Sequence, residues 1–273
     1  MEIDVQIPLL LCGVSLTIGF MLLSTSERRH GVETIRRSIV SMFFLASVSV
    51  VAEVFTGIMS WVWPAAAVDP IATAQVEIQN IMILVDAVYG IVITIWTGAG
   101  MTLGVFSTVT GRTFLEGSLI PALMQDTNAL IALNGELVLM WWTLYVFDVV
   151  LFPLFMTIGA FMSGMSFIKV EKKGYWIMLY MLMMRVLLPL AVHIAYTTTW
   201  NAIGANFVFV AGTAITPWTM PLSILWFRAS MVYLYGILVA AFMWIARVLV
   251  TQALGEEAQI NILGFISSRT SGG

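Results

Sequence analysis

The sequence predicts an all-α membrane protein built as a polytopic bundle of transmembrane helices. Hydrophobic residues make up 60% of the 273 residues and charged residues only 10%, a composition far from that of soluble domains. The apolar residues form long runs, several near the roughly 20 residues that a helix needs to cross a bilayer core of about 30 Å. The charged residues gather in short blocks between these runs, as expected of loops outside the membrane.

Six apolar runs are each long enough to form a transmembrane helix: 7–24, 38–63, 81–106, 138–166, 175–199 and 222–249. The first run is preceded by Glu2 and Asp4, whereas a secretion signal begins with basic residues. It also lacks a clear small-residue cleavage pattern. We therefore expect it to be a retained first helix.

Basic residues set the orientation of a membrane protein, and they cluster at 25–37 and 168–173. Both blocks are expected in the cytoplasm. With the N-terminus outside, the first three spans end at Arg112 on the inner side, so the chain must cross once more before 138–166 can end inside. This parity makes 114–136 a crossing element, despite its polar residues, and gives about seven crossings in total.

The alternative topology places Arg112 outside and makes 81–111 a re-entrant pair. It leaves 114–136 free to be a re-entrant hairpin or an exposed loop. The parity of the two basic blocks favours the crossing element over this alternative.

Two domains are expected, a helical bundle over 1–250 and an interfacial helix with a loose tail over 251–273. Glycine and proline between Asn201 and Pro221 oppose a continuous helix, so this stretch is predicted to be an outer cap or a re-entrant loop. We favour the cap. Apolar residues recur at near-helical spacing between Ala253 and Ile266, which predicts the interfacial helix.

Ionisable side chains inside transmembrane spans need a reason, because each costs roughly 2.5 to 3.5 kcal/mol at the centre of a helix. The predicted spans contain Glu53, Asp86, Asp148, Arg185, His193 and Arg228. Arg185, Pro189 and His193 share one helix face, which would suit a polar seam or an ion path. We favour a simpler interpretation, in which Arg185 forms a buried ion pair with Asp148 or Asp86 and locks helices together.

The sequence predicts no enzyme, no metal site and no cofactor. One of its two histidines, His30, lies in a predicted loop apart from His193, so a bis-histidine haem is not expected. No glycine-rich phosphate loop and no common hydrolase motif occurs. The single cysteine, Cys12, cannot form an internal disulfide.

About seven spans with an outer N-terminus resemble the microbial rhodopsins, which need a lysine in the last helix to bind retinal. The lysines of this chain are Lys169, Lys172 and Lys173, all in one predicted loop. The chemistry therefore excludes a retinal pigment.

Small residues four apart let helices approach closely in lipid, and Gly100 with Gly104 and Ala160 with Gly164 have this spacing. They predict tight internal packing or contacts in a homo- or hetero-oligomer. Tryptophans near the span ends fit an interfacial aromatic belt in contact with membrane lipids.

The short loops, the glycine-rich apolar character and the Trp141–Trp142 pair in a central span resemble the polytopic membrane subunit of type IV secretion and conjugation systems, including those of archaeal Ced-type DNA import. The resemblance implies a platform or conduit for DNA transfer across the plasma (cell or inner) membrane, working with a separate ATPase and a pilus subunit. The net charge of −3 and the lack of an arginine stripe disfavour direct sequence-specific binding of nucleic acid.

Two other functions remain open. The first is a small-solute or ion transporter that uses Asp86, Asp148, Arg185 and His193. The second is a membrane anchor subunit of an enzyme complex.

Overall fold

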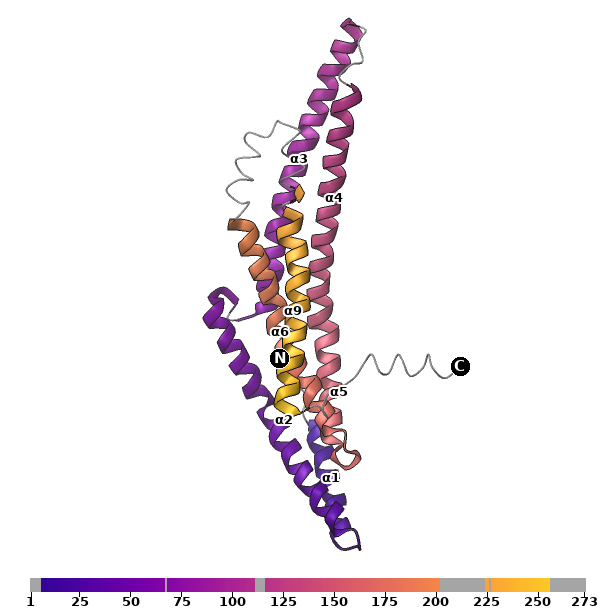
Figure 1. Cartoon of the computed structure of the whole chain (residues 1–273), viewed down its shortest axis with the longest axis vertical. Coiled ribbons are helices and arrows are strands. Elements are labelled where there is room, and N and C mark those ends of the chain that lie inside the picture. The colour runs from indigo at the N-terminus through magenta and orange to yellow at the C-terminus, as the bar shows by residue number, and fades with distance from the viewer. Residues whose placement is uncertain (1–5, 67, 111–115, 202–223, 226, 256–273) are drawn as a thin grey trace, which may run out of the picture. The chain divides into compact units, whose positions relative to one another are not determined.

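The computed structural model describes residues 6–66, 68–110, 116–201, 224–225 and 227–255, and within these ranges the regular elements are helices without any strand (Figure 1). The α-helices are α1 (Gln6–Leu23), α2 (Arg28–Val62), α3 (Pro70–Thr110), α4 (Glu116–Val146), α5 (Phe152–Gly164), α6 (Glu171–Thr199) and α9 (Leu234–Leu254). Short 3-10 turns are η1 (Pro64–Ala66) and η3 (Ser166–Ile168), and π-helical turns are η2 (Phe147–Leu151) and η5 (Arg228–Tyr233).

Six helical segments are long and apolar enough to cross a membrane, which fits a multi-pass membrane protein. They are Gln6–Leu23, Arg28–Val62, Pro70–Thr94, Thr127–Gly164, Glu171–Thr199 and Arg228–Leu254. The prediction of an all-α fold is confirmed over the described residues.

Helices α2 and α3 begin well before their predicted apolar runs. Helix α2 begins at Arg28, so most of the first basic block is helical. Helix α3 begins at Pro70, where the Asp69 carboxylate accepts hydrogen bonds from the backbone N–H groups of Ile71 and Ala72 at 3.1 and 3.2 Å. An aspartate cap followed by proline is a favourable helix start, and hydropathy alone does not detect it.

The chain from Glu116 to Gly164 is one continuous helical stretch, through α4, η2 and α5, and it does not reverse its direction. The predicted reversal of the chain between 136 and 138 is therefore wrong. Neither Asn134 nor Gly135 breaks a helix when no proline follows, since each costs at most about 1 kcal/mol relative to alanine. The alternative re-entrant pair over 81–111 is also wrong, because α3 is a single helix up to Thr110.

The chain divides into two compact units. Unit 1 comprises Met1–Val68, Val146–Leu187 and Ala241–Gly273, and unit 2 comprises Asp69–Tyr145 and Leu188–Ala240. Helices α6 and α9 contribute residues to both units. No composition shift or linker marks this division within the predicted 1–250 bundle, and the predicted tail helix falls largely in 256–273, outside the described residues.

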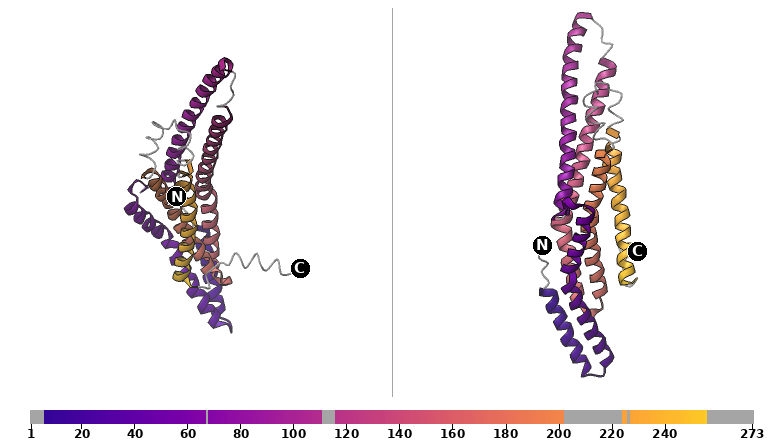
Figure 2. Two further views of the ribbon diagram at one scale, coloured as in Figure 1. Left: turned by 45° about the horizontal axis from the view of Figure 1, so that its top comes forward. Right: turned by 90° about the vertical axis from the view of Figure 1, so that its left-hand side faces the viewer.

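Unit 1 is held by very close helix contacts. Helices α1 and α2 form an antiparallel pair (Figure 2), and a Cβ atom added to Gly31 would lie 2.8 Å from the Gly19 carbonyl oxygen. The Ser15 hydroxyl on α1 donates to the carbonyl oxygen of Gly164 on α5 at 3.1 Å. Small residues at these crossings let the backbones approach closely enough for such bonds.

The two basic blocks meet at one end of unit 1. The hydroxyls of Ser38 and Ser166 are 3.0 Å apart, and Arg37 Nε lies 3.5 Å from a carboxylate oxygen of Glu171. Arg37 also pairs with Glu33, one turn earlier on α2. This arrangement is what the prediction of a shared cytoplasmic side requires.

Unit 2 is organised differently, around α3 and α4, which lie side by side in both figures. Their buried apolar residues recur at alternating spacings of three and four. They are Ile71, Ala74, Ile78, Ile81, Val85, Val88 and Val92 on α3, and Leu130, Leu133, Leu137, Met140 and Leu144 on α4. This spacing forms the narrow apolar seam typical of coiled coils.

Candidate functional site

In unit 1, Arg185 on α6 lies 3.4 Å from Asp148 on η2, measured from Nη2 to Oδ1. The guanidinium also sits 4.7 Å from the ring centre of Phe152. Of the two partners predicted for Arg185, Asp148 is therefore the one in contact. Both side chains are about a third exposed, at 30% and 29%, so this pair is not sealed in a dry core.

Asp148 belongs to a π-helical turn, and Arg228 of unit 2 begins another. A π turn inserts one residue into the helical register and is frequent at functional sites. In each case it aims a charged residue at a neighbouring helix. Hydropathy and spacing give no signal for these turns.

Arg228 and Glu136 form the most extensive ion pair in unit 2. Arg228 Nε donates to Glu136 Oε2 at 2.9 Å, and its Nη2 group contacts the other carboxylate oxygen. The fork of two parallel bonds fixes the relative position of the helices on either side. Glu136 was not among the predicted intramembrane charges, because it lies at the boundary between the predicted crossing element 114–136 and the span 138–166.

A second polar pair of unit 2 joins α6 to α3. His193 Nδ1 lies 2.8 Å from Glu77 Oε1, and the Glu77 side chain is only 11% exposed. Glu77 Oε2 is buried and has no hydrogen-bond partner in the part of the chain that the structure describes.

The polar residues of α6 do not form one continuous seam within a unit. Arg185 belongs to unit 1 and His193 to unit 2, and each contacts an acid of its own unit. Pro189 lies between them inside the helix. Since proline has no N–H group, it cannot donate a helical hydrogen bond to the carbonyl four residues before it.

Asp86 on α3 has a different partner from the acids above. Its Oδ1 accepts a hydrogen bond of 2.9 Å from Asn134 Nδ2 on α4. The two residues line a pocket of about 390 Å³ between the helices. No cationic side chain contacts Asp86 among the residues in the described ranges.

Glu53 lies on the outward side of α2. Its helical neighbours Val50, Val54 and Ile58 are 57%, 56% and 55% exposed, so the acid belongs to an apolar outer face. Within the described ranges its carboxylate makes no hydrogen bond or ion pair. Glu53 is therefore the predicted intramembrane charge for which the described residues provide no partner.

For Ala160 and Gly164, the structure decides between internal packing and contacts in an oligomer. Ala160 is buried, and a Cβ atom on Gly164 would lie 2.7 Å from the Pro8 carbonyl oxygen, so this face packs internally against α1. Gly100 and Gly104 lie in α3, but their surroundings are outside the described residues. A tighter contact, which the four-residue spacing does not reveal, joins Gly159 and Gly174. An added Cβ on Gly174 would lie 2.5 Å from the Gly159 carbonyl oxygen.

The Trp141–Trp142 pair lies within α4 as part of an aromatic cluster. Their rings meet edge to face at 5.6 Å, and Trp141 stacks on Tyr145 at 5.6 Å. Trp142 is half exposed. The cluster sits within the span Thr127–Gly164, away from the span ends where an aromatic belt is expected.

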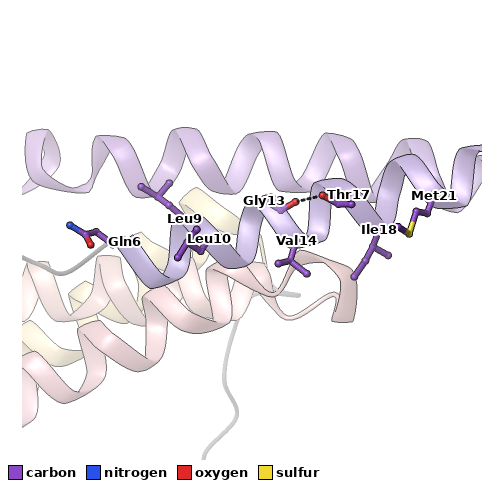
Figure 3. A pocket seen from close by; sticks show the side chains of 8 residues that line it. All are labelled: Gln6, Leu9, Leu10, Gly13, Val14, Thr17, Ile18 and Met21. Atoms are coloured by element: carbon purple, nitrogen blue, oxygen red, sulfur yellow. Dashed lines mark hydrogen bonds between the residues drawn. The ribbon is translucent and has the colours of Figure 1, made fainter.

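A larger hollow of about 910 Å³ runs along the outer face of α1 (Figure 3). All of its lining residues come from this one helix, and most are apolar. The Thr17 hydroxyl there already donates to the Gly13 carbonyl oxygen at 3.0 Å. Such a face suits contact with lipid chains and offers no reactive group.

Among the residues that the structure describes, no three His, Cys, Asp or Glu side chains are grouped in a way that could hold a metal ion. No protein-family model, no curated protein and no solved structure matches the chain. The polar contacts of the two units are therefore the basis for any functional proposal.

Proposed function

We propose that the chain is a multi-pass subunit of the plasma (cell or inner) membrane that serves as a platform or conduit in a multi-protein machine. Following the resemblance in its sequence, the machine transfers DNA and includes a separate ATPase and a pilus subunit. The chain supplies the membrane-embedded part, and its partners supply the energy and the extracellular fibre.

The observation that carries this proposal is Glu53. Each of the acids Glu77, Glu136 and Asp148 contacts a cationic or titratable side chain of its own unit. Glu53 instead faces outward between apolar residues of α2, with no partner in the described part of its own chain. A carboxylate in that position costs roughly 2.5 to 3.5 kcal/mol at mid-membrane, and a hydrogen-bond donor on a neighbouring subunit would offset this cost.

The proposed orientation places both basic blocks in the cytoplasm and the N-terminus outside. The contact of Arg37 with Glu171 supports a shared side for the blocks. The chain between them must then cross an even number of times. Three helical stretches, α2, α3 and the helix from α4 through α5, lie between the blocks, so three single crossings would not meet this requirement. Because the helix from Glu116 to Gly164 is continuous, a seventh crossing would need a reversal elsewhere in the chain, and the count of about seven crossings stays a prediction.

The proposal is tested by the mass of the native complex in mild detergent and by co-purification. We expect wild-type protein to migrate as an assembly that contains an ATPase and a pilus subunit. Glu53→Leu should lower the yield of the assembly, because it removes the group that the partner satisfies. Glu27→Gln changes the same charge at an exposed position without a side-chain cap bond, and should leave the assembly intact.

A wild-type monomer with full transport activity in reconstituted vesicles would remove the machine-subunit proposal and leave the transporter. Co-purification with redox partners in place of the ATPase would favour the anchor subunit of an enzyme complex. An assembly unaffected by Glu53→Leu would remove the assigned role of Glu53.

A further inference from the structure

Asp86 is the interhelical acid of unit 2 whose partner brings no positive charge. Glu136 meets Arg228, and Glu77 meets His193. Asp86 meets only the neutral amide of Asn134. The Asp86 side chain is exposed, and when ionised its carboxylate keeps a charge that no cationic side chain in the described ranges compensates. An uncompensated charge within a membrane span by default marks a functional site.

The surroundings of Asp86 form a pocket with room for a ligand. Its volume is about 390 Å³, and its walls come from both α3 and α4. Three lining side chains carry oxygen atoms, those of Asp86, Tyr89 and Asn134. The other walls include the apolar side chains of Val85, Leu130 and Val138. The pocket thus combines a few polar groups with a hydrophobic lining, as ligand sites usually do.

The orientation of Asn134 adds an independent argument. Its Nδ2 group donates to Asp86, because the reversed amide would set its oxygen against the carboxylate. In this orientation Asn134 Oδ1 does not take part in the bond to Asp86. It is buried and accepts no hydrogen bond from any residue that the structure describes. A buried acceptor without a partner costs about 1 to 3 kcal/mol, which a ligand could recover.

We propose that the pocket formed by Asp86, Asn134 and Tyr89 binds a monovalent cation together with part of its hydration shell. Carboxylate, amide and phenol oxygens are hard ligands suited to such ions. One carboxylate balances one positive charge, whereas a divalent ion would leave a net charge in an apolar site. The volume exceeds the roughly 30 Å³ share of a single water many times, so the ion keeps water molecules. This site goes beyond the proposed platform function and does not depend on it.

The test is equilibrium binding of radioactive sodium to the purified full chain in detergent. We expect saturable binding to wild-type protein, with potassium as a competitor. Asp86→Asn should lower the affinity about tenfold or more, since it removes the one charged ligand. Asn134→Leu should lower it less, because it removes only a neutral oxygen and leaves the carboxylate in place.

Two further variants keep the result interpretable. Gly135 lines the pocket, and a Cβ atom added there would meet nothing within 4 Å. Gly135→Leu should therefore fill the pocket and weaken sodium binding while Asp86 and Asn134 stay intact. Glu53→Gln removes an acid outside the pocket and should leave sodium binding unchanged. Thermal unfolding of each variant identifies any that fails to fold.

The proposal is overturned if wild-type protein shows no saturable sodium binding, or if folded Asp86→Asn binds sodium as tightly as wild type. Displacement of sodium by calcium more readily than by potassium would also contradict the monovalent class. Because Glu53 and Asp86 are tested separately, failure of the subunit assembly and failure of the cation site are distinguishable.

Discussion

Within unit 1 and within unit 2, the helices pack against one another through different kinds of contact. In unit 1 backbones come close at glycines, and Gly19, Gly31, Gly159, Gly164 and Gly174 would each bring an added Cβ within 3 Å of a neighbouring atom. In unit 2 a Cβ atom added to any of the described glycines would meet no atom within 4 Å, and these are Gly90, Gly98, Gly135 and Gly236. Unit 2 instead uses the regular seam of α3 and α4, with polar pairs beside it.

This difference has a physical basis. Helices in lipid gain little from burying apolar surface against each other, so they need close van der Waals contact or interhelical hydrogen bonds. Unit 1 relies mainly on the first, with serine hydroxyls bonding across the narrow gaps, and unit 2 relies more on the second. Substitutions that enlarge one of these five close-packed glycines should thus harm unit 1, whereas loss of a charge should harm unit 2 more.

The largest effect is expected for Gly174→Ala in unit 1. The added methyl group would lie 2.5 Å from both the Gly159 carbonyl oxygen and the Ser163 backbone nitrogen, and backbone atoms cannot move aside cheaply. We expect a loss of about 3 kcal/mol in the free energy of unfolding. Thermal or denaturant unfolding in detergent measures it.

The matched control is Gly236→Ala in unit 2, where the methyl group meets no atom within 4 Å. There alanine should stabilise the helix by up to about 1 kcal/mol. Equal effects at the two glycines would contradict the division between the units.

The next effect is expected for the ion pair of Arg228 and Glu136. Arg228→Leu leaves the Glu136 carboxylate without its two bonds, and we expect a loss of about 2 kcal/mol, moderated by the partial exposure of both side chains. The double variant Arg228→Leu with Glu136→Leu should recover much of the loss. Unfolding of the single and double variants in a mutant cycle gives the coupling, and an additive result would show that the pair does not couple.

A smaller effect is expected for Arg185 in unit 1. Its contact with Asp148 is longer, at 3.4 Å, and both groups are about a third exposed. Arg185→Leu should cost about 1 kcal/mol, and Asp148→Leu in the same chain should recover it. Wild-type stability of the single variant would indicate that Arg185 is solvated by water.

The last prediction concerns orientation and involves no loss of stability. Cysteines at positions 28 and 172 should react with a membrane-impermeant reagent from the cytoplasmic side, and a cysteine at 69 from the outside. The first two lie in the basic blocks that meet at Arg37 and Glu171. The background variant Cys12→Ser removes the native thiol. Reaction of 28 and 172 from opposite sides would rule out a shared cytoplasmic end.

The sequence alone determined the class of this protein. Long apolar runs and segregated charges suffice to predict membrane helices, because the bilayer imposes the same length on every span. Charge cost also picked out Arg185, His193 and Arg228 as residues that need partners. For Arg185 the sequence left two candidate partners, Asp148 and Asp86.

Tertiary structure decided the rest. In a membrane span nearly every position is apolar, so the seam of Ile78, Ile81 and Val85 has no contrast in the sequence and shows only as burial. The start of α3 at Pro70 depends on the Asp69 cap, and the length of the helix from Glu116 to Gly164 depends on its continuity. Hydropathy measures neither. Partners such as Glu136 for Arg228 are separated by 92 residues. Only the folded chain brings them within the few ångströms over which a hydrogen bond acts.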